Sequence, residues 1–138
     1  MNKKLSKVIF FLVANYWCIS AFAQIQNDQS LSGIWLFKLD PEDKGLKENW
    51  QGTSFTDHIT LPGTTDEAHY GEKTSGSDFG ILTRAYKYYG PAWYSREIEI
   101  PSEWNGKRIR MELERVLWES RVFVDGKEVS VQDALSTP

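Results

Sequence analysis

Hydrophobic and polar residues alternate along several short segments of the chain, and turn-forming residues end each segment. The clearest segment follows Gly90-Pro91 and stops at Pro101, whose nitrogen cannot donate a hydrogen bond to a neighbouring strand. One parity contains Tyr94, Arg96, Ile98 and Ile100, and the other contains Trp93, Ser95, Glu97 and Glu99. This period of two predicts a β-strand with one buried face and one solvent-facing face.

The same pattern predicts further strands, which are separated by turns rather than by long amphipathic helices. They lie at residues 33–40, 58–63, 84–89, 108–116, 121–124 and 127–129. Asp125-Gly126 separates the last two strands, and this dipeptide suits a hairpin turn because it tolerates positive φ. Residues 41–50 should form an irregular loop with one helical turn, and residues 64–83 a long loop of the kind that is usually functional or disordered. Short antiparallel strands at this spacing predict an all-β sandwich.

The first 23 residues have the composition of a secretory signal peptide. Three lysines precede an apolar stretch, and Ala21-Phe22-Ala23 follows as a cleavage site. The apolar stretch is shorter than the ~20 residues that a membrane-spanning helix needs. We therefore expect a removed peptide at residues 1–23, a polar leader at 24–32 and the folded domain at 33–138.

Removal of this peptide changes the net charge and the cysteine content. The whole chain has 16 basic and 19 acidic residues, and three of the basic ones lie in the first 23. The remaining part therefore has 13 basic and 19 acidic residues, a net charge of −6, and it lacks Cys18, the single cysteine. An acidic domain without a basic run is a poor candidate for binding nucleic acid or an anionic membrane. Without disulfides, its hydrophobic core must stabilise the fold.

An ordered series of short motifs extends over nearly all of the chain after the expected peptide. In chain order the motifs are Gly33-Ile34-Trp35, Leu61-Pro62-Gly63, Trp93-Tyr94-Ser95-Arg96, Pro101 with Trp104, Gly106-Lys107-Arg108 and Val122-Phe123-Val124-Asp125-Gly126. This series resembles the N-terminal sugar-binding domain of glycoside hydrolase family 2, which includes β-galactosidases, β-mannosidases and β-glucuronidases. The resemblance implies an antiparallel jelly-roll β-sandwich of the galactose-binding-like type.

The resemblance also implies an activity, which is the retaining hydrolysis of a terminal β-linked sugar. Such hydrolysis needs two carboxyl groups about 5–5.5 Å apart, and in the family both are glutamates on a later (β/α)8 barrel. A barrel takes about 250 residues, so we expect it to be absent from these 138 residues. Glu112 and Glu114 share a predicted strand face, but alternation already explains them as solvent-facing residues. We expect no catalytic residue in this segment.

Three residues are candidates for contact with a sugar. Arg84 stands at the start of the strand after the long loop, where a polar residue of family members can touch the terminal sugar. The alternative for Arg84 is an ion pair with Asp66 or Asp78. His69 lies in the long loop, and loops often carry binding residues. Trp118 could stack on a pyranose ring, although tryptophans more often pack in a core or an interface.

The central motif itself is expected to be structural. Tyr94 should pack inside with its hydroxyl bonded, and the partly buried Arg96 should be paired or hydrogen-bonded. Trp93 lies on the opposite face and is expected to pack on a neighbouring domain. His58 and His69 are the only histidines and lack the spacing of metal ligands, so no metal or other cofactor is expected.

Together these inferences predict the non-catalytic N-terminal module of an exported β-glycosidase that acts in carbohydrate breakdown. Its partners would be a terminal β-linked sugar and the immunoglobulin-like and barrel domains that follow in the family. Its location would be the periplasm or surface of a bacterium. The alternatives are a free-standing carbohydrate-binding module and a sandwich domain that binds a non-sugar partner. Because family members continue with further strands, we expect the domain to be incomplete at its C-terminal end, with unpaired edges and marginal stability.

Overall fold

The computed structural model describes residues 28–77, 79–80, 82–116 and 118–133. The expected signal peptide lies outside these residues. Contacts divide the chain after Ser30, and the fold described below is that of the unit beginning at Leu31. Within the described ranges all regular structure is β-strand, apart from two short 3-10 helices, η1 (Trp50–Gly52) and η2 (Ser102–Trp104). The predicted all-β class is confirmed, and the jelly-roll connectivity stays a prediction.

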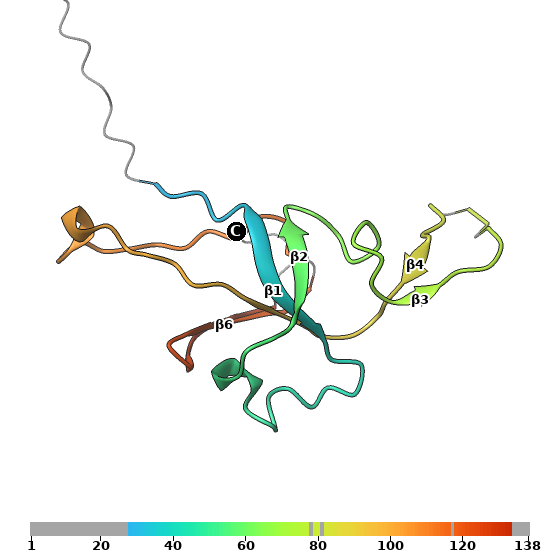
Figure 1. Ribbon diagram of the computed structural model, residues 1–138, viewed down its shortest axis with the longest axis horizontal. Coiled ribbons are helices and arrows are strands. Elements are labelled where there is room, and N and C mark those ends of the chain that lie inside the picture. Colours follow the sequence, from blue (N-terminus) through green and yellow to red (C-terminus); the bar gives the residue numbers. More distant parts are fainter. Residues whose placement is uncertain (1–27, 78, 81, 117, 134–138) are drawn as a thin grey trace, which may run out of the picture. The chain divides into compact units, whose positions relative to one another are not determined.

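The main sheet consists of three antiparallel strands in the order β2-β1-β5. The strands are β1 (Gly33–Leu39), β2 (Asp57–Leu61) and β5 (Ala92–Ser95). Figure 1 shows β1 and β2 side by side. Because β1 is central, its Leu36 lies opposite both His58 of β2 and Ser95 of β5. The strand predicted at residues 33–40 is therefore confirmed almost to its ends.

Two further antiparallel pairs complete the described strands. β3 (Glu72–Lys73) pairs with β4 (Tyr86–Lys87), and β6 (Ser120–Val124) pairs with β7 (Lys127–Gln132). Asp125 and Gly126 have φ angles of 49° and 74°, so this dipeptide forms the predicted hairpin turn. The predicted loop at residues 64–83 contains β3, and the strand predicted at 84–89 is limited to β4.

A small hydrophobic core lies on one face of the main sheet. Phe37 is 0% exposed, Ile59 2% and Phe55 6%. The Phe37 ring centroid lies 4.7 Å from that of Tyr70 and 5.1 Å from that of Tyr94. Full burial of a side chain such as Phe37 stabilises a fold by about 1.5–3 kcal/mol. Phe37 is therefore the main apolar link between the sheet and the loop that follows β2.

The other face of the main sheet packs against η1 and the β6–β7 hairpin through Trp93. The Trp93 ring stacks on Phe123 with 5.7 Å between centroids, and its centroid lies 6.2 Å from that of Trp50. The Lys38 Nζ atom lies 3.3 Å from the centroid of the Trp50 ring. The prediction that Trp93 packs on a neighbouring domain is wrong, because elements of this same unit cover its face.

Tyr94 differs in part from its expected position. Its ring packs on Phe37 as the parity predicted, yet the residue is 41% exposed. Among the described residues its hydroxyl has no hydrogen-bond partner, so the expected bond is not formed. Burial of the ring, with a smaller effect of Tyr88, raises the pKa of Tyr94.

Two predicted strands form only in part or not at all. The strand predicted from Trp93 to Pro101 is paired only as far as Ser95, and no ladder includes residues 108–116. Four apolar residues on the face that was expected to be buried are 37–49% exposed, namely Ile98, Ile100, Ile109 and Met111. Alternation specifies which face of a strand is apolar, but it does not specify a neighbouring strand. A segment without a hydrogen-bonded neighbour is no strand, whatever its pattern.

Candidate functional site

The turn at residues 64–70 is closed by its own hydrogen bonds and carries His69 near its end. The Thr64 backbone N–H donates to Glu67 Oε2 at 3.0 Å, and the Glu67 N–H donates to Thr64 Oγ1 at 3.2 Å. This reciprocal pair has the chemistry of a capping box. His69 has a φ of 62°, and its N–H donates to the Asp66 carbonyl at 3.0 Å. The turn thus determines the direction of the His69 side chain.

The same turn is attached to two strands. The His69 ring stacks on Tyr86 of β4 with 4.9 Å between centroids and an interplanar angle of 28°. The Tyr86 backbone N–H donates to Asp66 Oδ1 at 2.7 Å. On the other side the Tyr70 hydroxyl donates to the His58 carbonyl of β2 at 3.0 Å. The loop that carries His69 is therefore held between β2 and β4.

Arg84 lies two residues before Tyr86 and is exposed. Its guanidinium carbon lies 6.0 Å from the centroid of the Tyr89 ring. Among the described residues no ion pair joins Arg84 to Asp66, whose Oδ1 accepts the Tyr86 N–H. Asp78, the other alternative partner, lies outside the described residues. The structure thus places the His69 ring on Tyr86 of β4, whereas Arg84 precedes β4 in the chain and its guanidinium lies near Tyr89.

Trp118 is separate from these two residues. It precedes β6, has a φ of 78° and is 74% exposed. Within the described part of the chain, no hydrogen bond, ion pair or ring contact joins it to His69 or Arg84. Trp118 therefore does not pack in a core within the described residues, and both packing at an interface and stacking on a sugar stay predictions for its exposed ring.

The other family-motif residues lie in the connections around β5. The Arg96 Nη1 atom donates to the carbonyls of Leu31 and Ser32 at 2.7 and 2.9 Å. Arg96 thereby ties the end of β5 to the residues that precede β1. Pro101 precedes η2, which contains Trp104, and Gly106 follows with a φ of 73°.

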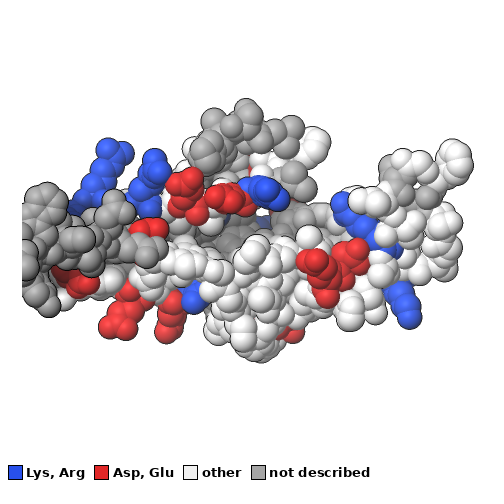
Figure 2. Space-filling view, turned by 90° about the horizontal axis from the view of Figure 1, so that it is seen from above, with Lys and Arg blue, Asp and Glu red and all other residues white. Residues whose placement is uncertain are grey.

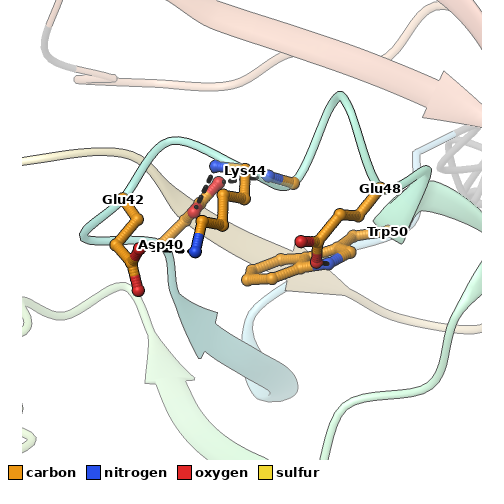
Figure 3. Close-up of polar contacts among 6 residues, drawn as sticks. Asp40, Glu42, Lys44, Glu48 and Trp50 are labelled. Carbon is orange, nitrogen blue, oxygen red and sulfur yellow. Dashed lines mark hydrogen bonds and ion pairs between the residues drawn. The ribbon is translucent and has the colours of Figure 1, made fainter.

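Asp40, the last residue of the strand predicted at 33–40, is a buried polar residue. It is 2% exposed. Its Oδ1 accepts the Lys44 N–H at 2.8 Å, and its Oδ2 accepts the Gly45 N–H at 2.8 Å and the Trp93 indole N–H at 3.1 Å. Figure 3 shows this carboxylate inside the loop that follows β1. The signal available in the sequence was an Asp directly before a Pro at a strand end, since Asp side chains commonly bond to the backbone of the turn that follows.

The environment of Asp40 keeps its carboxyl ionised. Burial opposes ionisation, but its pKa still lies below the usual 3.8. The pKa is lowered by hydrogen bonds from the backbone N–H groups of Lys44 and Gly45 and from the Trp93 indole, and by the positive charge of Lys38. A general acid needs a raised pKa. Asp40 therefore organises a loop and is unsuited to protonating a leaving group.

Surface carboxylates of the described region are mixed with basic groups rather than gathered into one site. Figure 2 shows acidic and basic side chains on the same face. Glu112 Oε2 lies 2.9 Å from Arg110 Nη2. Glu112 and Glu114 are both exposed, in agreement with the solvent-facing interpretation. The described residues contain no group of three His, Cys, Asp or Glu side chains that could hold a metal ion, and no helix there is long and apolar enough to cross a membrane.

Comparison with known proteins identifies the family. The family model described as "Glycosyl hydrolases family 2, sugar binding domain" matches residues 29–138. A beta-glucuronidase from Paenibacillus borealis is 29% identical over 102 residues, which are 74% of this chain and 16% of that protein. No solved structure matches the chain. Because the family model covers most of the sequence and the described strands are antiparallel, the chain belongs to the sugar-binding domain family of the family 2 glycosyl hydrolases.

Proposed function

We propose that this chain is the non-catalytic, N-terminal sugar-binding module of an exported β-glycosidase. The observation that carries the proposal is the family match over residues 29–138. The chain covers 16% of the beta-glucuronidase from Paenibacillus borealis, which is consistent with a module beside a larger catalytic part. We assign the two carboxyl groups of retaining hydrolysis to a (β/α)8 barrel of the parent protein, with an immunoglobulin-like domain between barrel and module.

His69 and Arg84 are the proposed contacts of this module with the terminal sugar. Both side chains belong to the region around Tyr86, and both can present N–H donors to a ligand. A guanidinium such as that of Arg84 can bind a carboxylate in a bidentate manner. This chemistry favours a β-glucuronide, the substrate class that the name of the relative suggests.

Export is the second part of the proposal. Three early lysines, the apolar stretch and Ala21-Phe22-Ala23 support a signal peptide at residues 1–23. The location would be the periplasm or surface of a bacterium, where oligosaccharides or polysaccharides are degraded. N-terminal sequencing of the protein recovered from the periplasmic or extracellular fraction should find a chain beginning at Gln24. Recovery of an uncleaved chain from the cytoplasm would contradict export.

The non-catalytic role is tested with nitrophenyl β-glycosides. The purified 138-residue chain should release no nitrophenol above background, whereas the longer protein that contains the barrel should hydrolyse one of the substrates. Turnover by the chain alone would overturn the non-catalytic assignment. Inactivity of the longer protein toward β-galactosides, β-mannosides and β-glucuronides would overturn the assignment of its parent activity.

The exposure of Trp118 favours a second candidate, a free-standing carbohydrate-binding module. An indole that is 74% exposed offers an open face to a pyranose ring. This candidate requires measurable affinity for a glycan without any barrel. Calorimetry of the chain with β-galactosides, β-mannosides and β-glucuronides tests it, and the DNA downstream of the codon for Pro138 separates the two candidates.

A further inference from the structure

Residues 108–114 form a segment that joins no sheet of the described chain. The segment follows Gly106, whose φ is 73°, and it ends before Arg115, whose φ is 56°. Its residues make no backbone–backbone hydrogen bond to another described residue, and Figure 1 shows it as an orange trace without an arrow. Such a segment presents unpaired N–H and C=O groups, which are a template for pairing with a strand of another chain.

Charged and apolar side chains alternate along the 108–114 segment. Arg110 Nη2 lies 2.9 Å from Glu112 Oε2, as expected for residues two positions apart on one side of an extended chain. The other parity is apolar, and its Ile109 and Met111 are 49% and 41% exposed. In chain order the residues are Arg108, Ile109, Arg110, Met111, Glu112, Leu113 and Glu114. The segment therefore has one charged face and one partly exposed apolar face.

The charges of the segment are complementary to those of a second copy that runs in the opposite direction. Two arginines precede Met111 and two glutamates follow it, at equal distances. In an antiparallel pair of copies centred on Met111, Arg110 of each copy lies opposite Glu112 of the other. The same register places Arg108 opposite Glu114. Opposite charges at facing positions stabilise an antiparallel pair, and like charges destabilise it.

Other arrangements of the same two segments bring like charges together. A parallel pair in register places each arginine opposite an arginine and each glutamate opposite a glutamate. A shift of the antiparallel register by two residues places Arg110 opposite Arg110, or Glu112 opposite Glu112. A shift by one residue brings charged side chains opposite apolar ones. Only the register centred on Met111 pairs all the charges and also places Ile109 opposite Leu113.

We propose that the 108–114 segment is a dimer interface, at which a second copy of this chain pairs with it in an antiparallel ladder centred on Met111. The dimer is isologous, because the same segment serves both copies. The second chain replaces water as the partner of the backbone N–H and C=O groups. Seven residues per chain make a small interface, so the dimer is weak, with a Kd between about 10 µM and 1 mM. The proposal goes beyond the glycosidase function and does not depend on it.

Sedimentation equilibrium of the 138-residue chain tests the association. Over concentrations from about 10 µM to 1 mM, the mean mass should rise from the 15.9 kDa of one chain toward twice that value and no further. A single-chain mass at every concentration would overturn the proposal. Growth beyond two copies would also overturn it, because an isologous pair is closed.

A swap of charges tests whether the arginines and glutamates face each other across the dimer. Arg110→Glu alone, or Glu112→Arg alone, should weaken the dimer at least about tenfold, because like charges then face each other twice. The two substitutions together restore opposite charges and should return the Kd to within about threefold of wild type. Lys47→Glu is the control, since it makes the same change of net charge as Arg110→Glu at an exposed position outside the segment. It should leave the Kd nearly unchanged.

Cysteine cross-linking tests the register. In a chain that also carries Cys18→Ser, Met111→Cys places two thiols at directly facing positions, whose Cα atoms are about 4.5–5.5 Å apart in a ladder. A disulfide spans that distance. Ile109→Cys is the matched control on the same face. Its two thiols would be four residues apart along the ladder, which is about 13 Å. Mild oxidation and a non-reducing gel should show a covalent dimer for Met111→Cys and little for Ile109→Cys, and equal cross-linking would overturn the proposal.

The variants also exclude association through another part of the chain. Pairing through residues 1–23 or through another strand edge would leave the single charge variants as strongly associated as wild type, and that result would overturn the proposal. A double variant as weak as the single variants would overturn it too. Thermal melting by circular dichroism establishes that each variant is folded before its association is compared.

Discussion

The indole nitrogen of Trp93 donates a 3.1 Å hydrogen bond to Oδ2 of Asp40, across 53 positions of the chain. The same carboxylate accepts the backbone N–H groups of Lys44 and Gly45. One buried charge therefore joins the loop after β1 to the strand β5. This relationship connects the family motif around Trp93 with a residue that has no part in that motif.

Replacing Asp40 by Asn should destabilise the fold by about 2–3 kcal/mol, because hydrogen bonds to a buried charged group are lost and an amide NH₂ faces N–H donors. Urea unfolding followed by tryptophan fluorescence measures this change. Glu42→Gln is the matched control, since Glu42 is exposed and paired only with Lys44 at the surface (Figure 3). Surface ion pairs contribute little to the free energy of unfolding, so Glu42→Gln should leave the urea midpoint nearly unchanged. Equal losses in both variants would contradict the role of Asp40.

The stability of the fold should decrease in acid through Asp40. Its pKa in the folded state lies below the usual 3.8, so the unfolded chain binds the proton more readily. The contribution of Asp40 is then complete above the unfolded pKa of about 3.9, and it is lost as the pH falls through the folded pKa. Urea midpoints measured from pH 7 down to acid should fall more steeply for the wild type than for Asp40→Asn. An equal pH dependence of the urea midpoint in the wild type and in Asp40→Asn would refute the role of Asp40 in this loss of stability.

Gly45→Ala should be destabilising because the loop leaves no space for a side chain. An added Cβ atom would lie 2.2 Å from Trp93 Nε1 and 2.4 Å from Trp93 Cε2. Overpacking of this kind costs about 1–3 kcal/mol. At Gly52 an added Cβ meets nothing within 4 Å, so Gly52→Ala should be neutral or slightly stabilising. Thermal melts of both variants make the comparison, and a stable Gly45→Ala variant would show that the Trp93 contact is loose.

Arg96→Met should destabilise the fold by about 1–3 kcal/mol, because two charge-assisted hydrogen bonds to backbone carbonyls are lost. Arg121→Met is the control. Arg121 pairs with Glu119 and Glu128 at the surface, where such pairs contribute little. Unfolding in urea should therefore distinguish the two arginines. A larger loss for Arg121 would show that the link from β5 to the residues before β1 is unimportant.

In the proposed parent β-glycosidase, Arg84→Gln should raise the KM for a β-glucuronide by about tenfold, since the proposed charge-assisted contact with the carboxylate is removed. The KM for a neutral β-glycoside should change much less. Arg110→Gln is the control, because Arg110 pairs with Glu112 at the surface. Steady-state kinetics with matched nitrophenyl substrates measure these values. An unchanged KM for the glucuronide would exclude Arg84 from sugar binding.

The elements predicted correctly depend on local chemistry. β1 follows a run of strand-forming residues that ends at Asp40-Pro41, and the β6–β7 turn depends on two residues that accept positive φ. The predictions that failed depend on distant residues. Residues 108–116 alternate as a strand should, but no neighbouring strand pairs with them within the described residues. Trp93 was assigned to a neighbouring domain, whereas Phe123 and Trp50 cover it.

The candidate site shows the same division. The sequence predicts His69 as a candidate because of its loop, and Arg84 because of its place at the start of a strand. The structure adds that the His69 ring stacks on Tyr86, 17 positions further along the chain, a relationship that no local pattern contains. The sequence does not predict the burial of Asp40, because the partners of its carboxylate include an indole 53 residues away.

The sequence by itself determined the all-β class, the first strand, the Asp125-Gly126 hairpin and the family, because alternation, turn chemistry and motif order are properties of neighbouring residues. The tertiary structure alone decided that Asp40 is buried and ionised and that Trp93 packs inside the unit. Burial and hydrogen-bond partnership depend on which distant segments meet, and a one-dimensional pattern does not specify that meeting.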